Sequence, residues 1–245
     1  MNPRVAAQLG PVIAIGGYPV LSTTPEKLAD HLLAVIAART STALFFANTN
    51  FVVKNRFLLE RADDLPVVLV NDGVGMDIAA TLIHRTRFEQ NLNGTDFVPF
   101  LFARADRPLR VYMIGGTPEV LATAVEHVAT DLGQVVVGSS DGFAGLTPDL
   151  VGRVAAAAPD VVLVAMGNPL QERWILDHAA QLPPSVFVGV GALFDFWAGA
   201  KARAPEALRR LRLEWLYRLY LEPRRLARRY TLDIAVFLRA CYRYR

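Results

Sequence analysis

Short apolar runs alternate with helical patterns along most of the chain. Runs of this length, bounded by polar or glycine-rich stretches, are typical of the buried strands of a parallel sheet. The runs are Ala43–Ala47, Val67–Val70, Val111–Ile114, Val135–Val137, Val161–Ala165 and Val186–Val188. The helical patterns include Pro25–Ala38, Pro118–Leu132, Pro148–Ala157 and Leu170–Gln181. This order predicts an α/β fold, with a Rossmann-like, mostly parallel sheet covered by helices.

Each predicted strand ends in small or polar residues. Ligands of open α/β sheets bind outside the carboxyl ends of the strands, so these residues should converge on one site. The strand ends include Asn48-Thr49-Asn50, Asn71-Asp72-Gly73, Gly115-Gly116-Thr117, Gly138-Ser139-Ser140 and Gly167-Asn168-Pro169.

The α/β pattern gives way to a basic segment near residue 198. Residues 201–245 contain 13 Lys or Arg and 4 Asp or Glu, whereas residues 1–200 have a net charge of −6. Apolar residues recur there every three or four positions, which predicts a helix. They are Leu208, Leu211, Trp215 and Leu219, ahead of the helix-breaking Pro223. We therefore divide the chain into an α/β body, 1–197, and a basic helical appendage, 198–245.

The basic appendage indicates an anionic partner, which can be a phosphate, an acidic membrane surface or a nucleic acid. The alternative is a basic helix that packs on the acidic body. Nucleic acid is disfavoured because the body carries no DNA- or RNA-binding signature. Arginine forks match phosphate oxygens, and three arginines have the spacing of one helix face. They are Arg218, Arg225 and Arg228.

The compartment follows from what the sequence lacks. Hydrophobic residues make up 53% of the chain, yet no apolar run approaches the ~20 residues of a membrane-spanning helix. The N-terminus lacks a secretion signal, and the single Cys241 fits a reducing compartment. We expect a cytoplasmic protein.

Two strand ends carry residues suited to chemistry. Gly115-Gly116, between a strand and a helix, can cradle a phosphate through backbone N–H groups, although a tight turn explains the pair equally well. Asp72, followed by Gly73 and Gly75, can act as a general base toward a hydroxyl. The other interpretation of Asp72 is a turn or helix cap, and the spacing alone favours neither.

Further polar residues gather at strand and helix boundaries. Two side-chain amides and a carboxylate surround one strand-to-helix junction and suit the binding of a sugar or a uracil. The junction contains Gly167, Asn168, Gln171 and Glu172. Asp195 is another acid near a strand end. Gly94 and Asp96 belong to a turn before a helix, where a capping role is favoured over substrate binding. No histidine pair has metal-site spacing and no DxD pair ends a strand, so we expect neither a metal nor a cofactor.

Taken in order, these motifs resemble the WecG/TagA/CpsF family of bacterial glycosyltransferases. The resemblance extends from about Pro11 to Tyr230. It rests on Asn50 after a strand and on NDGVG, NGTDF, MIGG, GNPLQERW, GVGALFDFWAG and AP…EWLYRLYLEPRRLARRY. Members transfer a hexose, such as glucose or N-acetylmannosamine, from a UDP-sugar to a polyprenyl-diphosphate-linked sugar. They act at the cytoplasmic face of the membrane in the synthesis of surface polysaccharide or teichoic acid. The resemblance therefore implies an inverting transfer by a protein that is peripheral on the inner face of the cell membrane.

The resemblance also implies roles for particular residues. Asp72 matches the proposed base, and Asn50 and Gln171 match substrate-binding positions. The arginines that match contacts to the lipid diphosphate are Arg218, Arg225 and Arg228. Asn48 stands where the family often has Thr. Many members have Arg where this chain has Asn91, so we expect altered recognition of the sugar or phosphate and favour glucose as the hexose.

The expected partners are a UDP-sugar, a polyprenyl-diphosphate-linked acceptor and a membrane surface, with no nucleic acid and with homo-oligomerisation left open. Two other classes compete with this hypothesis. One is a nucleotide-dependent oxidoreductase or methyltransferase with a basic oligomerisation helix, although the dinucleotide fingerprint is missing. The other is a nucleic-acid-binding protein that uses the basic tail.

Overall fold

The computed structural model describes residues 9–61, 65–205, 216–217, 220 and 234–244. Within these residues, eight strands form one sheet in the order β1-β2-β4-β3-β8-β7-β5-β6. All neighbouring strands are parallel except β1 and β2. The strands are β1 (Val12–Ile15), β2 (Tyr18–Leu21), β3 (Thr42–Ala47), β4 (Val67–Asn71), β5 (Arg110–Gly115), β6 (Val135–Ser140), β7 (Val161–Ala165) and β8 (Val186–Gly189). The predicted α/β fold is confirmed.

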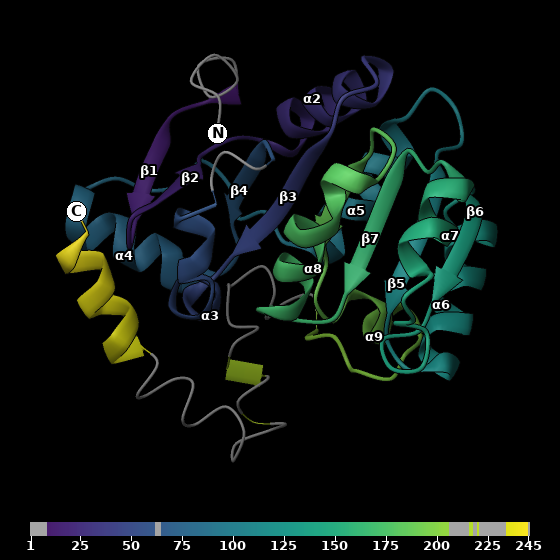
Figure 1. The fold of residues 1–245 in the computed structure, drawn as a ribbon. Coiled ribbons are helices and arrows are strands. Elements are labelled where there is room, and N and C mark those ends of the chain that lie inside the picture. The colour runs from purple at the N-terminus through teal and green to yellow at the C-terminus, as the bar shows by residue number, and fades with distance from the viewer. Residues whose placement is uncertain (1–8, 62–64, 206–215, 218–219, 221–233, 245) are drawn as a thin grey trace.

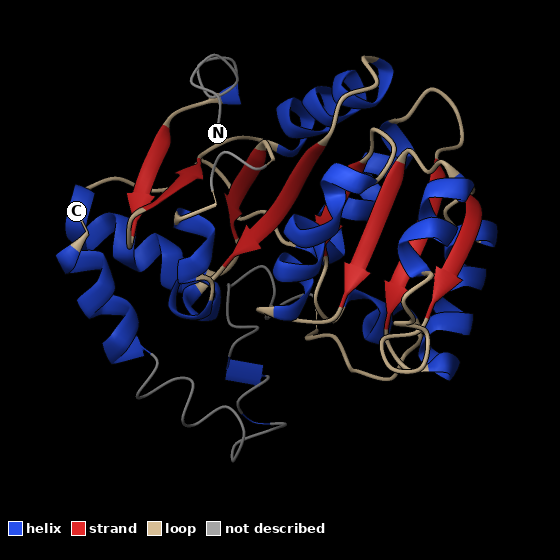
Figure 2. Cartoon of the chain, viewed as in Figure 1, coloured by secondary structure: helices blue, strands red, loops and turns tan. Residues whose placement is uncertain are grey.

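Helices cover both faces of this sheet (Figures 1 and 2). They are α2 (Pro25–Ala37), α3 (Thr49–Lys54), α4 (Val74–His84), α5 (Gly94–Arg104), α6 (Pro118–Thr130), α7 (Leu150–Ala157), α8 (Leu170–His178) and α9 (Leu193–Trp197), with 3-10 turns at Arg56–Leu59 and Ala179–Gln181. The face lined by Phe45 and Phe187 packs against α3, α4, α7 and α8. The opposite face, lined by Leu44 and Val188, packs against α2, α5, α6 and α9.

The two halves of the sheet come from the two halves of the chain. Strands β1 to β4 form one half, β5 to β8 form the other, and the halves meet where β3 pairs with β8. Phe45 of β3 is in register with Gly189 of β8. Because the pair is parallel, loops from both halves of the chain leave the sheet at the same edge.

A hairpin of β1 and β2 precedes the strands that the apolar pattern predicts. Gly16 and Gly17 form its turn with φ values of 59° and 89°, which favour glycine. A Cβ atom on Gly16 would lie 2.6 Å from Val52. Each hairpin strand has four residues, of which one or two are exposed, and the search for continuous apolar runs did not predict them.

The last described segment of the basic appendage folds back onto the body. Residues 234–243 form a helix (yellow in Figure 1) whose Phe237 and Cys241 are each 1% exposed. The Arg56 guanidinium lies 4.2 Å from the centre of the Tyr244 ring. Burial raises the pKa of the Cys241 thiol to about 11. The end of the chain is therefore part of the core, while the boundary at residue 198 stays a prediction.

No helix within the described ranges is both long and apolar enough to cross a bilayer. Leu216 and Tyr220, which belong to the basic appendage, are 47% and 81% exposed.

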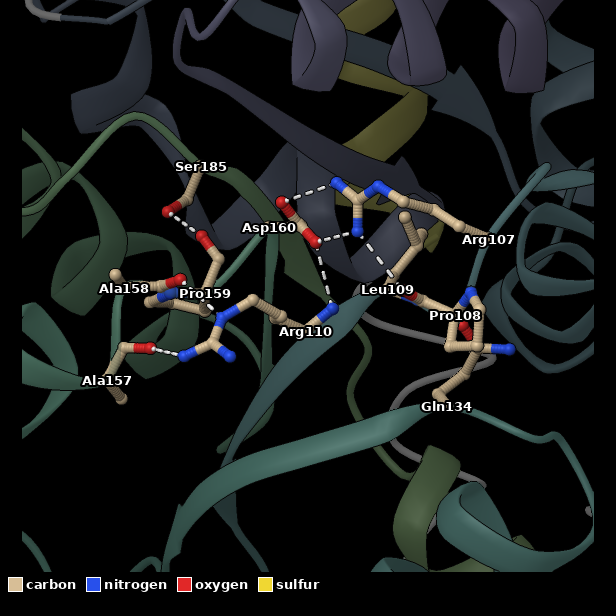
Figure 3. A network of polar contacts seen from close by, with 10 residues as sticks. All are labelled: Arg107, Pro108, Leu109, Arg110, Gln134, Ala157, Ala158, Pro159, Asp160 and Ser185. Carbon is tan, nitrogen blue, oxygen red and sulfur yellow. Dashed lines mark hydrogen bonds and ion pairs between the residues drawn. The ribbon is translucent and has the colours of Figure 1, made fainter.

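A buried carboxylate holds the amino ends of three strands together (Figure 3). Asp160, 3% exposed, accepts hydrogen bonds from Arg107 Nη1 (2.8 Å), Arg107 Nη2 (3.1 Å) and the Arg110 N–H (2.9 Å). Its backbone bonds the start of β5 through Arg110 O and the start of β8 through the Val186 N–H. Burial acts to raise the pKa of Asp160, but these hydrogen bonds outweigh it and hold the pKa below its ordinary value.

We expect Asp160→Ala to lower the free energy of unfolding by about 3 kcal/mol, because Arg107 and a strand N–H lose a buried acceptor. Since the folded-state pKa is lowered, the stabilisation is present above the ordinary pKa and is lost as the pH falls through the folded value. Urea unfolding at several pH values measures both effects. Asp30→Ala is the matched control, because Asp30 also pairs with an arginine, Arg104, but is exposed. Equal losses in the two variants would contradict the prediction.

Candidate active site

Asp72 and Asn48 lie together at the carboxyl ends of the neighbouring strands β4 and β3. Asn48 Nδ2 donates to Asp72 Oδ2 over 3.3 Å, and Asn48 Oδ1 caps α3 by accepting from the Phe51 N–H at 3.1 Å. The Asp72 N–H donates to Ala47 O at 2.7 Å, which continues the β-ladder past the strand end. The capping bond fixes the Asn48 side chain, and its Nδ2 group in turn orients the half-buried Asp72 carboxylate.

The loop that carries Asp72 is fixed from its other side by Asn91. Gly73 has φ = 100°, and its N–H donates to Asn91 Oδ1. Next to Asn91, the Leu92 N–H donates to Asn71 O at 3.0 Å, so this segment runs along the end of β4. The contribution of Asn91 to recognition stays a prediction, and its amide oxygen accepts a hydrogen bond within the protein.

Gln171 joins the loops that follow β7 and β8. Its Oε1 accepts from the Gly167 N–H (3.2 Å) and the Gly191 N–H (2.9 Å), and its Nε2 donates to Glu172 Oε1 (2.8 Å). With its amide oriented to suit its neighbours, Asn168 donates to Glu172 Oε2 at 3.2 Å. The structure thus brings together all four residues predicted at this junction.

Glu172 is the most perturbed acid of the site. It is fully buried, and this burial raises its pKa to about 7 against the opposing effect of the Gln171 hydrogen bond. A carboxyl group with such a pKa exchanges its proton near neutral pH, which is common at functional sites.

Gly115 and Gly116 form the turn from β5 into α6. A Cβ atom on Gly115 would lie 2.3 Å from Ala165 O of the adjacent strand β7, so strand packing alone requires glycine there. Gly116 O accepts from the Gly142 N–H at 2.8 Å, and Thr117 Oγ1 caps α6. A cavity of about 290 Å³ adjoins the start of α6, lined among others by Pro118, Ser139, Ser140, Asp141 and Arg153.

The remaining predicted acids are held by residues that follow α9. Asp96, in the first turn of α5, pairs with Arg203 and also accepts from Asn93 Nδ2 at 2.8 Å. Asp195 of α9 pairs with Lys201 at 2.9 Å. The capping prediction for the segment before α5 is confirmed, because Asn93 Oδ1 accepts from the Asp96 N–H. Gly94 follows the cap residue, and a Cβ atom added to it would lie 3.1 Å from the Phe46 ring.

Several helices begin at this same edge of the sheet. Helices α3, α4, α6 and α8 follow the ends of β3, β4, β5 and β7 directly, and α5 begins beside the end of β4. Their N-termini carry partial positive charge, so the edge favours an anion.

The structure brings most predicted site residues to one edge, and it reveals others. Asn50 lies half-buried in the first turn of α3. Arg218, Arg225 and Arg228 lie outside the described residues. The sequence did not indicate Lys201, Arg203 or Gly191. The signal for the first two was their position just after the predicted acid Asp195, where oppositely charged residues can pair.

We expect Glu172→Gln to flatten the pH dependence of stability. The unfolded chain ionises this carboxyl near its ordinary value of 4.5, and the folded chain does so near 7. The wild-type free energy of unfolding should therefore fall as pH rises between these values, by up to about 3 kcal/mol. Urea unfolding at a series of pH values checks this. Glu119→Gln, at an exposed carboxyl in the first turn of α6, is the control. Parallel curves for wild type and Glu172→Gln would contradict the prediction.

Comparisons with known proteins confirm the resemblance seen in the motifs. Residues 13–245 match the family described as Glycosyl transferase WecG/TagA/CpsF. The N-acetylglucosaminyldiphosphoundecaprenol N-acetyl-beta-D-mannosaminyltransferase of Bacillus spizizenii is 35% identical over 159 residues. This stretch covers 64% of the present chain and 62% of that relative. The family match spans nearly the whole chain and includes every motif at the candidate site. The chain therefore belongs to the glycosyl transferase WecG/TagA/CpsF family.

Proposed function

We propose that this protein is an inverting glycosyltransferase. It moves a hexose from a UDP-sugar to a polyprenyl-diphosphate-linked sugar, in the synthesis of a cell-surface polysaccharide or teichoic acid. Family membership supports the reaction class. The printed name of the Bacillus spizizenii relative supports an acceptor of this kind, because that enzyme acts on a sugar carried by diphosphoundecaprenol.

One observation carries the proposal: the Asp72 carboxylate lies at the carboxyl end of β4, one strand from the junction of the two sheet halves, and Asn48 orients it at an edge where several helices begin. Asp72 takes the proton from the acceptor hydroxyl as its oxygen attacks the anomeric carbon. The bond from that carbon to the UDP oxygen breaks, and UDP leaves with the electron pair. Attack from the face opposite UDP inverts the configuration.

The departing diphosphate requires positive charge, which this chain can supply without a metal. Helices α3, α4, α6 and α8 begin at the edge where UDP would leave, and α5 begins beside the end of β4, so their N-termini place partial positive charge there. Preorganised dipoles of this kind stabilise charge that develops in a transition state. We propose that these dipoles and nearby cations replace a divalent ion.

The acceptor places the reaction at a membrane. We propose that the enzyme binds peripherally at the cytoplasmic face, with its basic appendage around the lipid diphosphate. Arg218, Arg225 and Arg228 remain the predicted contacts. The high exposure of Tyr220 supports an interfacial position for this segment, because tyrosine side chains favour the boundary between water and lipid.

We expect Asp72→Asn to reduce the transfer rate by at least about 100-fold, because the variant cannot accept the acceptor proton. Donor binding and thermal unfolding should stay near wild type. The measurement is release of UDP with a synthetic lipid-diphosphate-sugar acceptor. Asp106→Asn, at an exposed aspartate remote from the sheet edge, is the matched control. Turnover near wild type in Asp72→Asn would exclude Asp72 as the base.

The donor is tested with a panel that contains UDP-glucose and UDP-N-acetylmannosamine, with mass analysis of the lipid product. The name of the relative favours N-acetylmannosamine, whereas Asn91 at a position that is often Arg favours glucose. We expect one of the two to be transferred, and expect EDTA to leave the rate unchanged. Loss of transfer in EDTA with recovery on adding Mg²⁺ would contradict the metal-independent mechanism. Absence of transfer from every nucleotide sugar would overturn the proposed function.

A further inference from the structure

The first turn of α5 lies beside the candidate base but lacks a cation of its own. Asn91, two residues before the N-cap residue Asn93, accepts a hydrogen bond from the Gly73 N–H through its amide oxygen. Asn93 caps the helix and also donates to Asp96. These side chains hold the loop in place, yet none of them carries positive charge toward a departing diphosphate.

Arg203, in the segment that follows α9, contacts this turn. Its Nη2 donates to Asp96 Oδ1, and its side chain is 29% exposed. Among the described residues, its Nε and Nη1 groups have no hydrogen-bond partner. The guanidinium is thus fixed at one corner, with N–H groups still free to bind a second anion.

The segment that carries Arg203 is anchored on both sides of it. Before it, the Lys201 N–H donates to Asp195 O at 3.1 Å and Lys201 Nζ to Asp195 Oδ2 at 2.9 Å. After it, Ala204 is 4% exposed. Arg203 is therefore a positioned side chain, so binding an anion requires little further ordering.

The chemistry of the position fits a diphosphate. An arginine fork binds two phosphate oxygens at once and remains charged at all relevant pH values. The α5 N-terminus adds partial positive charge in the same place. The Asp96 carboxylate accepts from Arg203 and also from Asn93, so it helps to orient the guanidinium.

We propose that Arg203 binds the diphosphate of the nucleotide-sugar donor and that Asp96 positions it. This inference rests on the proposed function and assigns to the region after α9 a direct part in donor binding. Arg203 then stabilises the negative charge on UDP as the sugar leaves.

The test is calorimetric titration of the full-length protein with UDP and with uridine. Arg203→Ala should weaken UDP binding by about 10- to 100-fold and leave uridine binding unchanged, since only the diphosphate loses a contact. Arg203→Lys should fall in between, because a lysine keeps the charge but not the fork. Arg104→Ala is the matched control. Arg104 lies at the other end of α5 and also pairs with an aspartate, Asp30 of α2.

Steady-state kinetics give a second readout. The KM for the donor should rise in Arg203→Ala, and the KM for the acceptor should not. Asp96→Asn should weaken UDP binding less than Arg203→Ala, and the double variant should match Arg203→Ala alone, because Asp96 acts through the arginine.

Three results would overturn the inference: unchanged UDP affinity in Arg203→Ala, an equal loss of uridine affinity, or a rise confined to the acceptor KM. If Arg203→Ala proves unfolded by circular dichroism, Arg203→Lys decides, and UDP affinity equal to wild type in that variant counts against a bidentate contact. Failure of the proposed function is distinguishable, because the wild-type protein would then show neither sugar transfer nor UDP binding.

Discussion

The pairing of β3 with β8 is the contact on which the rest of the structure depends. It joins the strands of the first half of the chain to those of the second within one sheet, so it brings Asp72 and Asn48 to the same edge as Gln171 and Gly191. Its closeness depends on Gly189, because a Cβ atom there would lie 2.9 Å from both Phe45 Cδ1 and Gln171 Nε2. A larger residue would press on the central strand and on the amide that joins two site loops. One glycine thus serves both packing and site geometry.

Much of the fold was accessible from the sequence because the central strands are buried on both faces. Such strands must be apolar throughout, so β3, β4, β7 and β8 stand out as short runs. The β1–β2 hairpin did not, because its stability comes from contacts distant in sequence. Tyr18 is fully buried against Phe51, and the Gly16 turn packs on the helix at 234–243. No local pattern records partners that lie over two hundred residues away.

In the candidate site too, the sequence predicted the positions of residues but not their long-range contacts. Asp72 and Asn48 stand directly after strand ends and Gln171 lies in the first turn of the helix after β7, so topology makes them converge, and the motifs were sufficient to select them. What the sequence could not provide is which side chains bind one another. Gln171 was predicted for recognition, yet its amide joins two backbone loops. Arg203 and Lys201 looked like part of a general basic excess, and only the folded chain pairs them with Asp96 and Asp195.

The buried helix at 234–243 has a consequence for the opposite end of the sequence. Its Phe237 and Cys241 are each 1% exposed, and the Gly16 turn of the β1–β2 hairpin packs on it. The first described strands and the last described helix are therefore parts of one packing unit. Removing the helix would expose the apolar side of the hairpin to water, so the loss would weaken an edge of the sheet and not merely shorten the chain.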